Sequence, residues 1–224
     1  IMDIEIREER PEDYQQTENV TKEAFWNRYA PGCIEHYLLH VMRTSPAFVR
    51  PLDLVAVHGE QIIGNVVFVK GRILTDEGEN VEVLTLGPIS VHPDFQRRGV
   101  GQKLIEVAAE KAAQLGYRAI LLCGDPDYYS KRGFLSAENY GIRTAQNKYF
   151  AALQVRELFL NALKGIQGRY FENPIYDVDP SKAEEFDSAF PRKEKSADTP
   201  CQKRLEELLR MQRDFLGNQT IDPK

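Results

Sequence analysis

The chain has 224 residues, of which 42% are hydrophobic and 28% charged, and its net charge at pH 7 is -5. This suits one domain with an extension or at most two small domains, with a sizeable core. The acidic balance argues against non-specific nucleic-acid binding. No apolar run is long enough to span a membrane, and Asp3, Glu5 and Arg7 interrupt any signal-peptide core, so we expect a cytoplasmic protein.

The three cysteines, Cys33, Cys123 and Cys201, are far apart and form no C-x-x-C pair. Their odd number and spacing predict neither a disulfide framework nor a zinc site, and no other metal site is expected. Cys123 ends an apolar segment and is expected to be a small buried hydrophobic residue.

The first third of the chain is predicted to hold a strand, two helices and a β-hairpin. Residues 1–7 alternate as a strand, and residues 11–26 and 34–42 have helix spacing. The hairpin consists of residues 54–57 and 61–69, joined by a turn at His58, Gly59 and Glu60. Residues 76–80 make another turn into a central strand, so the strands up to this point are expected to be antiparallel.

The central strand is interrupted at Gly87 and Pro88. Proline has no amide to donate to a ladder, so we expect a bulge or an edge there. The backbone amides of Ile89, Ser90 and Val91 would then be free to bind an extended ligand that itself carries amides, as an added strand would.

A glycine-containing turn follows this strand and leads into a helix. Gly99 and Gly101 allow close backbone approach, and the first amides of a helix lack intrahelical acceptors and attract anions. No Gly-Lys-Ser/Thr follows, so the turn is not a Walker A loop, and a Gly-x-Gly alone is weak evidence. The predicted anion-binding residues are Gln96, Arg97, Arg98, Gly99, Val100, Gly101, Gln102 and Lys103.

The helix after this turn has apolar residues at Val100, Leu104, Ile105, Ala108, Ala112 and Leu115, and Gly116 ends it. The apolar segment Ala119–Cys123 is predicted to be the next strand. A helix of this length can return the chain beside its start, which predicts a right-handed crossover between parallel strands.

The remainder of the chain is predicted to contain a short helix, one strand, an irregular segment and a terminal helix. Asp127 is expected to cap the short helix of residues 128–131, and residues 148–155 to form the strand. Residues 165–195 are expected to be irregular but packed on the core. The terminal helix begins with a capping-box pattern at Thr199 and Gln202. Its apolar side, with Leu205, Leu208, Leu209 and Phe215, could cover the core or form a homodimer.

A ligand with a pyrophosphate at one end and an amide-bearing arm at the other is coenzyme A. The residues that would bind it resemble the GNAT superfamily of N-acetyltransferases. Its V-x-P-x-x-Q-x-x-G-x-G segment is matched by Val91, Pro93, Gln96, Gly99 and Gly101, and its later Y-x-x-x-G-F by Tyr129, Gly133 and Phe134. The resemblance covers roughly the middle third of the chain.

The resemblance implies a mixed α/β sheet, mostly antiparallel, with a central parallel pair and flanking helices. It implies an acetyltransferase domain in residues 1–158, and we read residues 159–224 as an extension packed on the core that ends in an amphipathic helix. It further implies that acetyl-CoA is the co-substrate, that the amide of Ile89 bonds the thioester carbonyl, and that Val91 pairs with the pantetheine arm. Trp26, Tyr29 and Tyr37 would lie near the acceptor site, although ordinary helix-to-sheet packing is the favoured explanation for each of them taken singly.

Tyr129 is the predicted general acid, because a phenol of pKa about 10 can protonate a thiolate of pKa about 8.5. Tyr128 is expected to face elsewhere and serve packing. Two carboxylates are open as the base: Glu82 on the central strand, where some relatives carry one, and Asp125 beyond the next strand. The asparagine common in the family is absent, since Leu122 and Cys123 occupy that position.

The expected reaction is direct transfer of the acetyl group to a primary amine, because Cys123 has no neighbour in sequence that would activate its thiol. The alternative is a non-catalytic acyl-CoA-binding regulatory module, and a nucleotide-binding protein is a third reading. Aminoglycosides, polyamines, amino acids and protein amines all remain open as acceptors.

Overall fold

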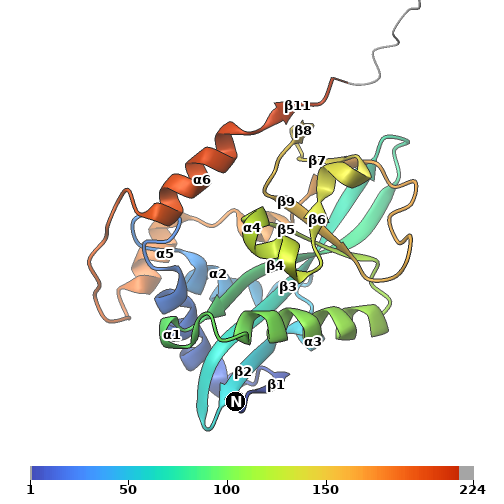
Figure 1. Ribbon diagram of the computed structural model, residues 1–224. Helices are drawn as coiled ribbons and strands as arrows, with labels where there is room; N and C mark the ends of the chain where they lie inside the picture. Colours follow the sequence, from blue (N-terminus) through green and yellow to red (C-terminus); the bar gives the residue numbers. More distant parts are fainter. Residues whose placement is uncertain (1, 217–224) are drawn as a thin grey trace, which may run out of the picture.

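A computed structural model describes residues 2–216 of the chain (Figure 1). Its main sheet has nine strands, in the order β1-β2-β3-β4-β5-β9-β6, with β10 pairing β3 and β7. The strands are β1 (Glu5–Glu8), β2 (Leu54–His58), β3 (Gln61–Thr75), β4 (Asn80–Val91), β5 (Ala119–Cys123), β6 (Leu135–Ser136), β7 (Ile142–Arg143), β9 (Leu153–Glu157) and β10 (Gly168–Phe171). A separate pair joins β8 (Lys148–Tyr149) to β11 (Arg213–Asp214). The helices are α1 (Tyr14–Phe25), α2 (Glu35–Met42), α3 (Val100–Gln114), α4 (Pro126–Tyr129), α5 (Pro180–Asp187) and α6 (Pro200–Arg210).

The two long strands β3 and β4 form the centre of the sheet, and their ladder is irregular where the sequence predicts it. The antiparallel register runs Val66↔Ile89 on one side and Phe68↔Leu86 on the other, with a shift between them opposite Gly87 and Pro88. The predicted interruption of the central strand is therefore confirmed.

Strands β4 and β5 are the parallel pair that the crossover through α3 predicts. They pair only at Leu84↔Ile120 and Thr85↔Leu121. On its other side β5 pairs antiparallel with β9. Beyond Thr85, β4 has no ladder to β5, so the two strands diverge at the level of Gly87.

Helices cover both faces of the sheet. On one face, α3 buries Leu104, Ile105 and Ala108 in a cluster with Phe68, Leu84 and Ile120 of the strands. On the other face, Val20 of α1 packs with Val55, Val57 and Ile62, and α2 contributes Leu38, Leu39 and Met42 against Val67 and Val69. Because the strands lie between two layers of helices, side chains on both faces of the sheet are buried, which explains why the predicted strands are so uniformly apolar. The prediction of a mixed, mostly antiparallel sheet with one parallel pair and flanking helices is confirmed.

The prediction of one strand over residues 148–155 is wrong. A turn closed by the bond from the Leu153 amide to the Phe150 carbonyl separates β8 from β9. The two pieces pair with different partners, β8 with β11 and β9 with β5 and β6. A continuous apolar pattern does not reveal such a change of partner.

The prediction of an irregular segment over residues 165–195 is also wrong, because it contains β10 and α5. Strand β10 extends the sheet by pairing with β3 at Phe171↔Arg72 through Gly168↔Thr75. Helix α5 begins at Pro180, and the Asp179 side chain accepts a bond from the Ser181 amide as its cap. This Asp-Pro start is an ordinary helix signal that the aromatic and charged surroundings obscured.

Three boundaries also differ from the predictions. The cap of α4 is Asp125, which accepts from the Asp127 amide, so Asp127 is not the cap. The capping box of α6 at Thr199 and Gln202 is confirmed, but the helix ends before Phe215, and Leu209 is 48% exposed. The early strand runs from Glu5 to Glu8, and Ile1 lies outside the described residues.

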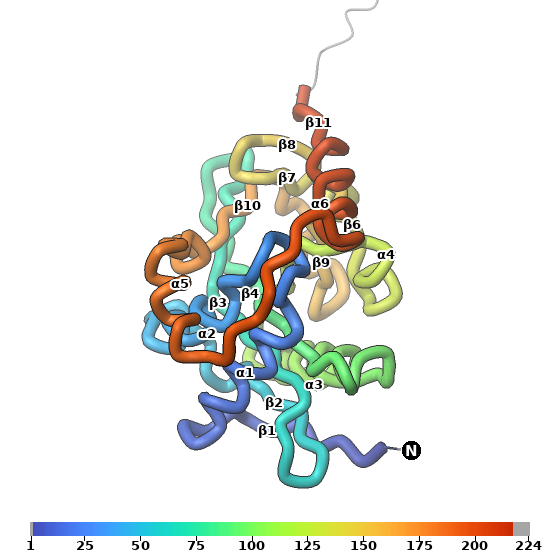
Figure 2. The backbone as a smooth tube through the Cα atoms, turned by 90° about the vertical axis from the view of Figure 1, so that its left-hand side faces the viewer, coloured from blue at the N-terminus to red at the C-terminus, as the bar shows by residue number. Residues whose placement is uncertain are grey.

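The segment between α5 and α6 runs across the C-terminal end of α1 (Figure 2). The Trp26 indole and the Asn27 amide both donate to the Glu194 carbonyl, at 2.8 and 3.0 Å. The Thr199 hydroxyl then donates to the Asn27 carbonyl at 2.9 Å. The loop that follows α1 is therefore fixed by the C-terminal part of the chain.

No helix within residues 2–216 combines the length and the apolar character needed to cross a membrane.

Candidate active site

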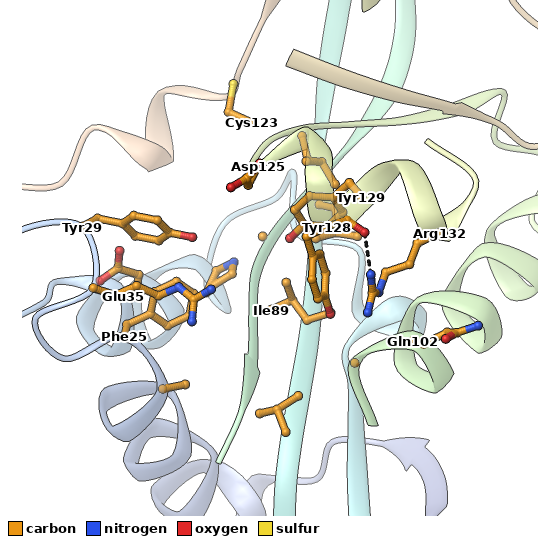
Figure 3. Close-up of a pocket in the computed structure, with 18 of the residues that line it drawn as sticks. Phe25, Tyr29, Glu35, Ile89, Gln102, Cys123, Asp125, Tyr128, Tyr129 and Arg132 are labelled. Carbon is orange, nitrogen blue, oxygen red and sulfur yellow. Dashed lines mark hydrogen bonds between the residues drawn. The ribbon is translucent and has the colours of Figure 1, made fainter. Parts of the chain in front are cut away.

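A cavity of about 630 Å³ lies between the helices α1 and α2, the diverging strands β4 and β5, and the N-terminal ends of α3 and α4 (Figure 3). Its volume is in the range of sites for cofactor-sized molecules. Most of the predicted site residues meet in this cavity. Those that line it are Tyr129, Asp125, Ile89, Val91, Gln96, Arg97, Gly99, Val100, Gly101 and Gln102.

The N-terminus of α3 opens into the cavity. Gly99 is its cap residue, with φ of 82°, a left-handed conformation that glycine adopts without strain. The Lys103 amide donates to the Gly99 carbonyl at 2.9 Å, so the amides of Val100, Gly101 and Gln102 precede the first intrahelical bond. These amides carry the positive end of the helix dipole, which is an arrangement that binds phosphate.

Two of the predicted anion-binding cations point elsewhere. The Lys103 ammonium donates to the Ile4 carbonyl, and the Arg98 guanidinium lies 5.7 Å from the centre of the Phe95 ring. Neither residue lines the cavity, whereas Arg97 does. Lys131 and Arg132 also line the cavity and add two cations that the predicted set did not contain.

The outward amides of β4 can be assigned from the ladder. The His92 amide donates to the Ile63 carbonyl at 2.8 Å, and hydrogen-bonded pairs alternate along an antiparallel ladder. Ser90 therefore bonds its partner Asn65 on β3, whereas the amides of Ile89 and Val91 point away from β3 toward the gap beside β5. The Gln96 side chain donates to the Val91 carbonyl at 3.0 Å and steadies this end of the strand.

Tyr129 stands on α4 and also lines the cavity. Its ring packs edge-on against Phe134, with ring centres 5.6 Å apart. A Cβ at Gly124 would lie 2.3 Å from the Tyr129 ring, so only glycine permits this placement. Burial raises the pKa of Tyr129 above its ordinary value, so the phenol is protonated at neutral pH.

Tyr128 also lines the cavity, so the expectation that it faces elsewhere is wrong. A Cβ at Gly101 would lie 2.7 Å from the Tyr128 hydroxyl, which places that hydroxyl at the first turn of α3. The Arg132 guanidinium stacks on the Tyr128 ring at 3.4 Å from its centre (Figure 3). Because α4 is a single turn, consecutive tyrosines can both face the cavity rim.

Residues 5–134 match the family model described as the acetyltransferase (GNAT) family, which is more than half of the chain. The chain belongs to the GNAT acetyltransferase family. Both motifs on which the resemblance rests lie within the matched residues, and the predicted membership is confirmed.

The similarity to individual GNAT proteins extends beyond the motifs. The chain is 30% identical over 135 residues to the uncharacterized N-acetyltransferase YhbS of Escherichia coli K12, covering 60% of this chain and 78% of YhbS. A crystal structure of E. coli YhbS in complex with CoA superposes with a TM-score of 0.70 at 25% identity, covering 80% of this chain and 94% of that one. The crystal structure of a Brucella melitensis GNAT acetyltransferase in complex with acetyl-CoA superposes with a TM-score of 0.63 at 26% identity, covering 79% of this chain and 100% of that one.

The two carboxylates predicted as the base lie in different surroundings. Glu82 does not line the cavity, and its half-exposed carboxylate lies 3.5 Å from the Lys70 ammonium. Asp125 does line it, but Arg204 of α6 donates to both of its oxygens, at 3.1 and 3.2 Å. These bonds hold the pKa of Asp125 below its usual value, which weakens it as a base.

Two cavity carboxylates were not among the predicted site residues. Glu35 begins α2 beside Phe25 and Tyr29 (Figure 3), and Glu172 follows β10. Desolvation raises the pKa of both above the usual value. Nothing in their local sequence marks them as functional, because only the folded sheet brings them to one cavity.

Cys123 is a further correction, because its side chain is exposed to the cavity and is not a core residue. The surrounding protein atoms nevertheless raise the pKa of its thiol to about 12.

Within residues 2–216, no three side chains of His, Cys, Asp or Glu are grouped so that they could hold a metal ion.

Proposed function

We propose that this protein transfers the acetyl group of acetyl-CoA directly to a primary amine. One observation carries the proposal: a single cavity joins the free amides of α3, the outward amides of β4 and the phenol of Tyr129. Acyl transfer needs three functions together: a site that holds the acetyl donor, a hydrogen-bond donor for the oxyanion, and a proton for the leaving thiolate.

The α3 end of the cavity suits the pyrophosphate of the co-substrate. Val100, Gly101 and Gln102 offer backbone amides there, and Arg97 adds a guanidinium that can fork onto phosphate oxygens. The pantetheine arm would then run along β4, with the Val91 amide as its partner and the Ile89 amide on the thioester oxygen. Crystal structures of two similar GNAT proteins are in complex with CoA or acetyl-CoA, which supports coenzyme A as the ligand of this cavity.

Tyr129 is proposed to supply the proton that the leaving thiolate needs. Burial keeps the phenol protonated at neutral pH, although the same burial makes its phenolate costly. The phenol therefore stabilises the developing thiolate first as a hydrogen-bond donor and completes the proton transfer as sulfur leaves.

Replacing Tyr129 by Phe tests this role and separates an enzyme from a binding module. The variant loses one hydroxyl and keeps the ring packed on Phe134, so acetyl-CoA affinity by calorimetry should change little. The turnover of acetyl-CoA with a screened primary amine should fall by about 10² to 10⁴-fold. An unchanged turnover while chemistry limits the rate would exclude Tyr129 as the acid.

Direct transfer is supported by the state of the thiol that faces the cavity. Cys123, with a pKa of about 12, carries almost no thiolate at neutral pH and is a poor nucleophile. We expect Cys123→Ala to retain turnover within a few-fold of the parent. Mass spectrometry of the parent quenched during turnover should find no acetylated Cys123, and an acetyl-enzyme at this residue would contradict direct transfer.

A further inference from the structure

The C-terminal part of the chain, outside the residues that match the family model, reaches the place where β4 and β5 diverge. The Tyr170 hydroxyl of β10 bonds the Thr85 hydroxyl of β4. Its ring crosses β3 at Gly71, where a Cβ would lie 3.3 Å from the ring. The Tyr176 hydroxyl donates to the Gly87 carbonyl at 2.8 Å. Two tyrosines of this segment are thus bonded to β4 on either side of Leu86.

Glu172 lies between these two anchors in the sequence and lines the same cavity. The phenols of Tyr170 and Tyr176 and the thiol of Cys123 are the titratable groups that interact with its carboxylate. Cys123 is the last residue of β5, two residues beyond the final β4–β5 pair. Glu172 is therefore placed near the divergence, in the cavity that Ile89 and Val91 of β4 also line.

No cation neutralises Glu172 within residues 2–216, since none of the ion pairs or side-chain hydrogen bonds found there includes it. Arg72 of β3 and Arg169 of β10 lie over the Phe171 ring instead, at 4.5 and 5.5 Å from its centre. The Glu172 side chain is exposed at the cavity, and the protein atoms around it raise the pKa of its carboxylate above the usual value. An accessible carboxylate without a cation can attract an ammonium group and accept a proton from it.

We propose that Glu172 is the general base of the reaction, supplied by the C-terminal segment, and that the acceptor enters as a primary ammonium ion. This inference rests on the proposed acetyl transfer. The ammonium ion gives one proton to the Glu172 carboxylate, and the neutral nitrogen then attacks the thioester carbon. The C–N bond forms, the C–S bond breaks with its electron pair on sulfur, and sulfur takes the Tyr129 proton. The second proton lost by nitrogen restores the phenol through water, and the proton on Glu172 leaves to solvent.

Glu35 offers a matched control because it is a second cavity carboxylate with a raised pKa. One of its oxygens already accepts the Ile34 amide at 3.0 Å, and Figure 3 places it beside Phe25 and Tyr29, on the α1–α2 side. Glu35→Gln should weaken acceptor binding and raise KM. It should leave the shape of the pH profile unchanged, since Glu172 remains.

The decisive experiment compares the parent, Glu172→Gln and Glu35→Gln with acetyl-CoA and two kinds of nucleophile. The first nucleophile is a primary amine, chosen as the best substrate among tyramine, putrescine and lysine. The second is water, whose attack is measured as slow release of CoA in the absence of amine. At pH 7 we expect Glu172→Gln to lower the rate by about 10² to 10⁴-fold. Toward pH 10 the loss should shrink for the amine, because aliphatic amines with pKa near 10 then deprotonate without help.

The outcomes separate this proposal from the proposed function. If Glu172→Gln has the parent's rate and pH profile with both nucleophiles, Glu172 is not the base. If only Glu35→Gln changes the pH profile, Glu35 has that role and the inference fails while acetyl transfer stands. If the parent itself fails to bind acetyl-CoA in calorimetry, the proposed function fails. Acetyl-CoA affinity of Glu172→Gln, measured in the same way, verifies that the variant is folded.

Discussion

At the scale of single residues, the position of Tyr129, the proposed acid, depends on a glycine that bears no chemistry. Gly124 follows β5, and the Tyr129 ring occupies the space that a side chain there would need. Gly124→Ala would place its methyl carbon 2.3 Å from the ring and 3.0 Å from Leu122. Overpacking of this kind usually costs about 1–3 kcal/mol.

We therefore expect Gly124→Ala to lower both thermal stability and turnover, because the displaced ring carries the proposed acid, the Tyr129 hydroxyl, with it. The measurement is melting temperature together with CoA release. In a Tyr129→Ala background the same change has no ring to meet, so its stability cost should fall. An equal cost in both backgrounds would show that the ring is not what the glycine accommodates.

The sequence predicted the residues whose role depends on local motif geometry. Gln96, Gly99, Gly101 and Tyr129 lie in fixed spacing around one turn and one short helix, so neighbours along the chain define their surroundings. Glu172 and Gly124 could not be predicted in this way. Their roles arise from contacts between distant segments, such as Tyr170 with Thr85, that no local pattern encodes.

At the scale of elements, the N-terminus of α3 can be tested with a matched pair of substitutions. Asn and Asp have nearly the same shape, both tolerate positive φ, and both cap helices well. Gly99→Asp and Gly99→Asn should therefore fold alike, since a Cβ at Gly99 meets nothing within 4 Å. Only the aspartate adds a negative charge where a pyrophosphate would bind.

We expect Gly99→Asp to bind coenzyme A at least tenfold more weakly than Gly99→Asn in calorimetry. The difference should shrink at high salt, because screening weakens interactions between exposed charges. Equal affinities of the two variants at low salt would place the pyrophosphate away from this helix end.

The elements predicted best are those with strong periodicity and clear end signals, such as α3 and β5. Strand β10 was missed because its four residues gain their conformation from pairing with β3, which lies about a hundred residues earlier. The break between β8 and β9 was missed for the same reason, because each piece is specified by its partner strand and not by its own composition.

At the scale of the whole molecule, α5 is joined to α1 and α2 by a buried polar cluster. Asp187 lies 2.7 Å from the Lys22 ammonium and 2.8 Å from His36 Nε2, and both of these side chains are almost fully buried. The His36 Nδ1 atom lies 3.4 Å from the Cys33 thiol. The same cluster holds the segment that leads into α6, since Lys22 also donates to the Pro191 carbonyl.

This cluster predicts an acid sensitivity of folding. Burial is the main cause that lowers the pKa of His36 below 6.5, with Lys22 adding to it and Asp187 opposing it. Below about pH 6.5 the unfolded chain therefore binds a proton that the folded chain refuses, so stability falls as the pH falls through that window. We expect the melting temperature to fall as the pH is lowered from 7.5 to 5.5, by about 2–4 °C for each kcal/mol lost from the free energy of unfolding.

His36→Gln should flatten this dependence, because glutamine can still donate to Asp187 and does not titrate. The matched control is His40→Gln, which changes a half-exposed histidine of the same helix that bonds Glu18 at 2.9 Å. The control should keep the parent's slope, whereas His36→Gln should be less stable at pH 7.5 and lose less on acidification. If both variants keep the parent's slope, His36 does not govern the acid response. Titration of the His36 ring by NMR checks this directly. A pKa at or above 6.5 would contradict the lowering that burial of the ring predicts.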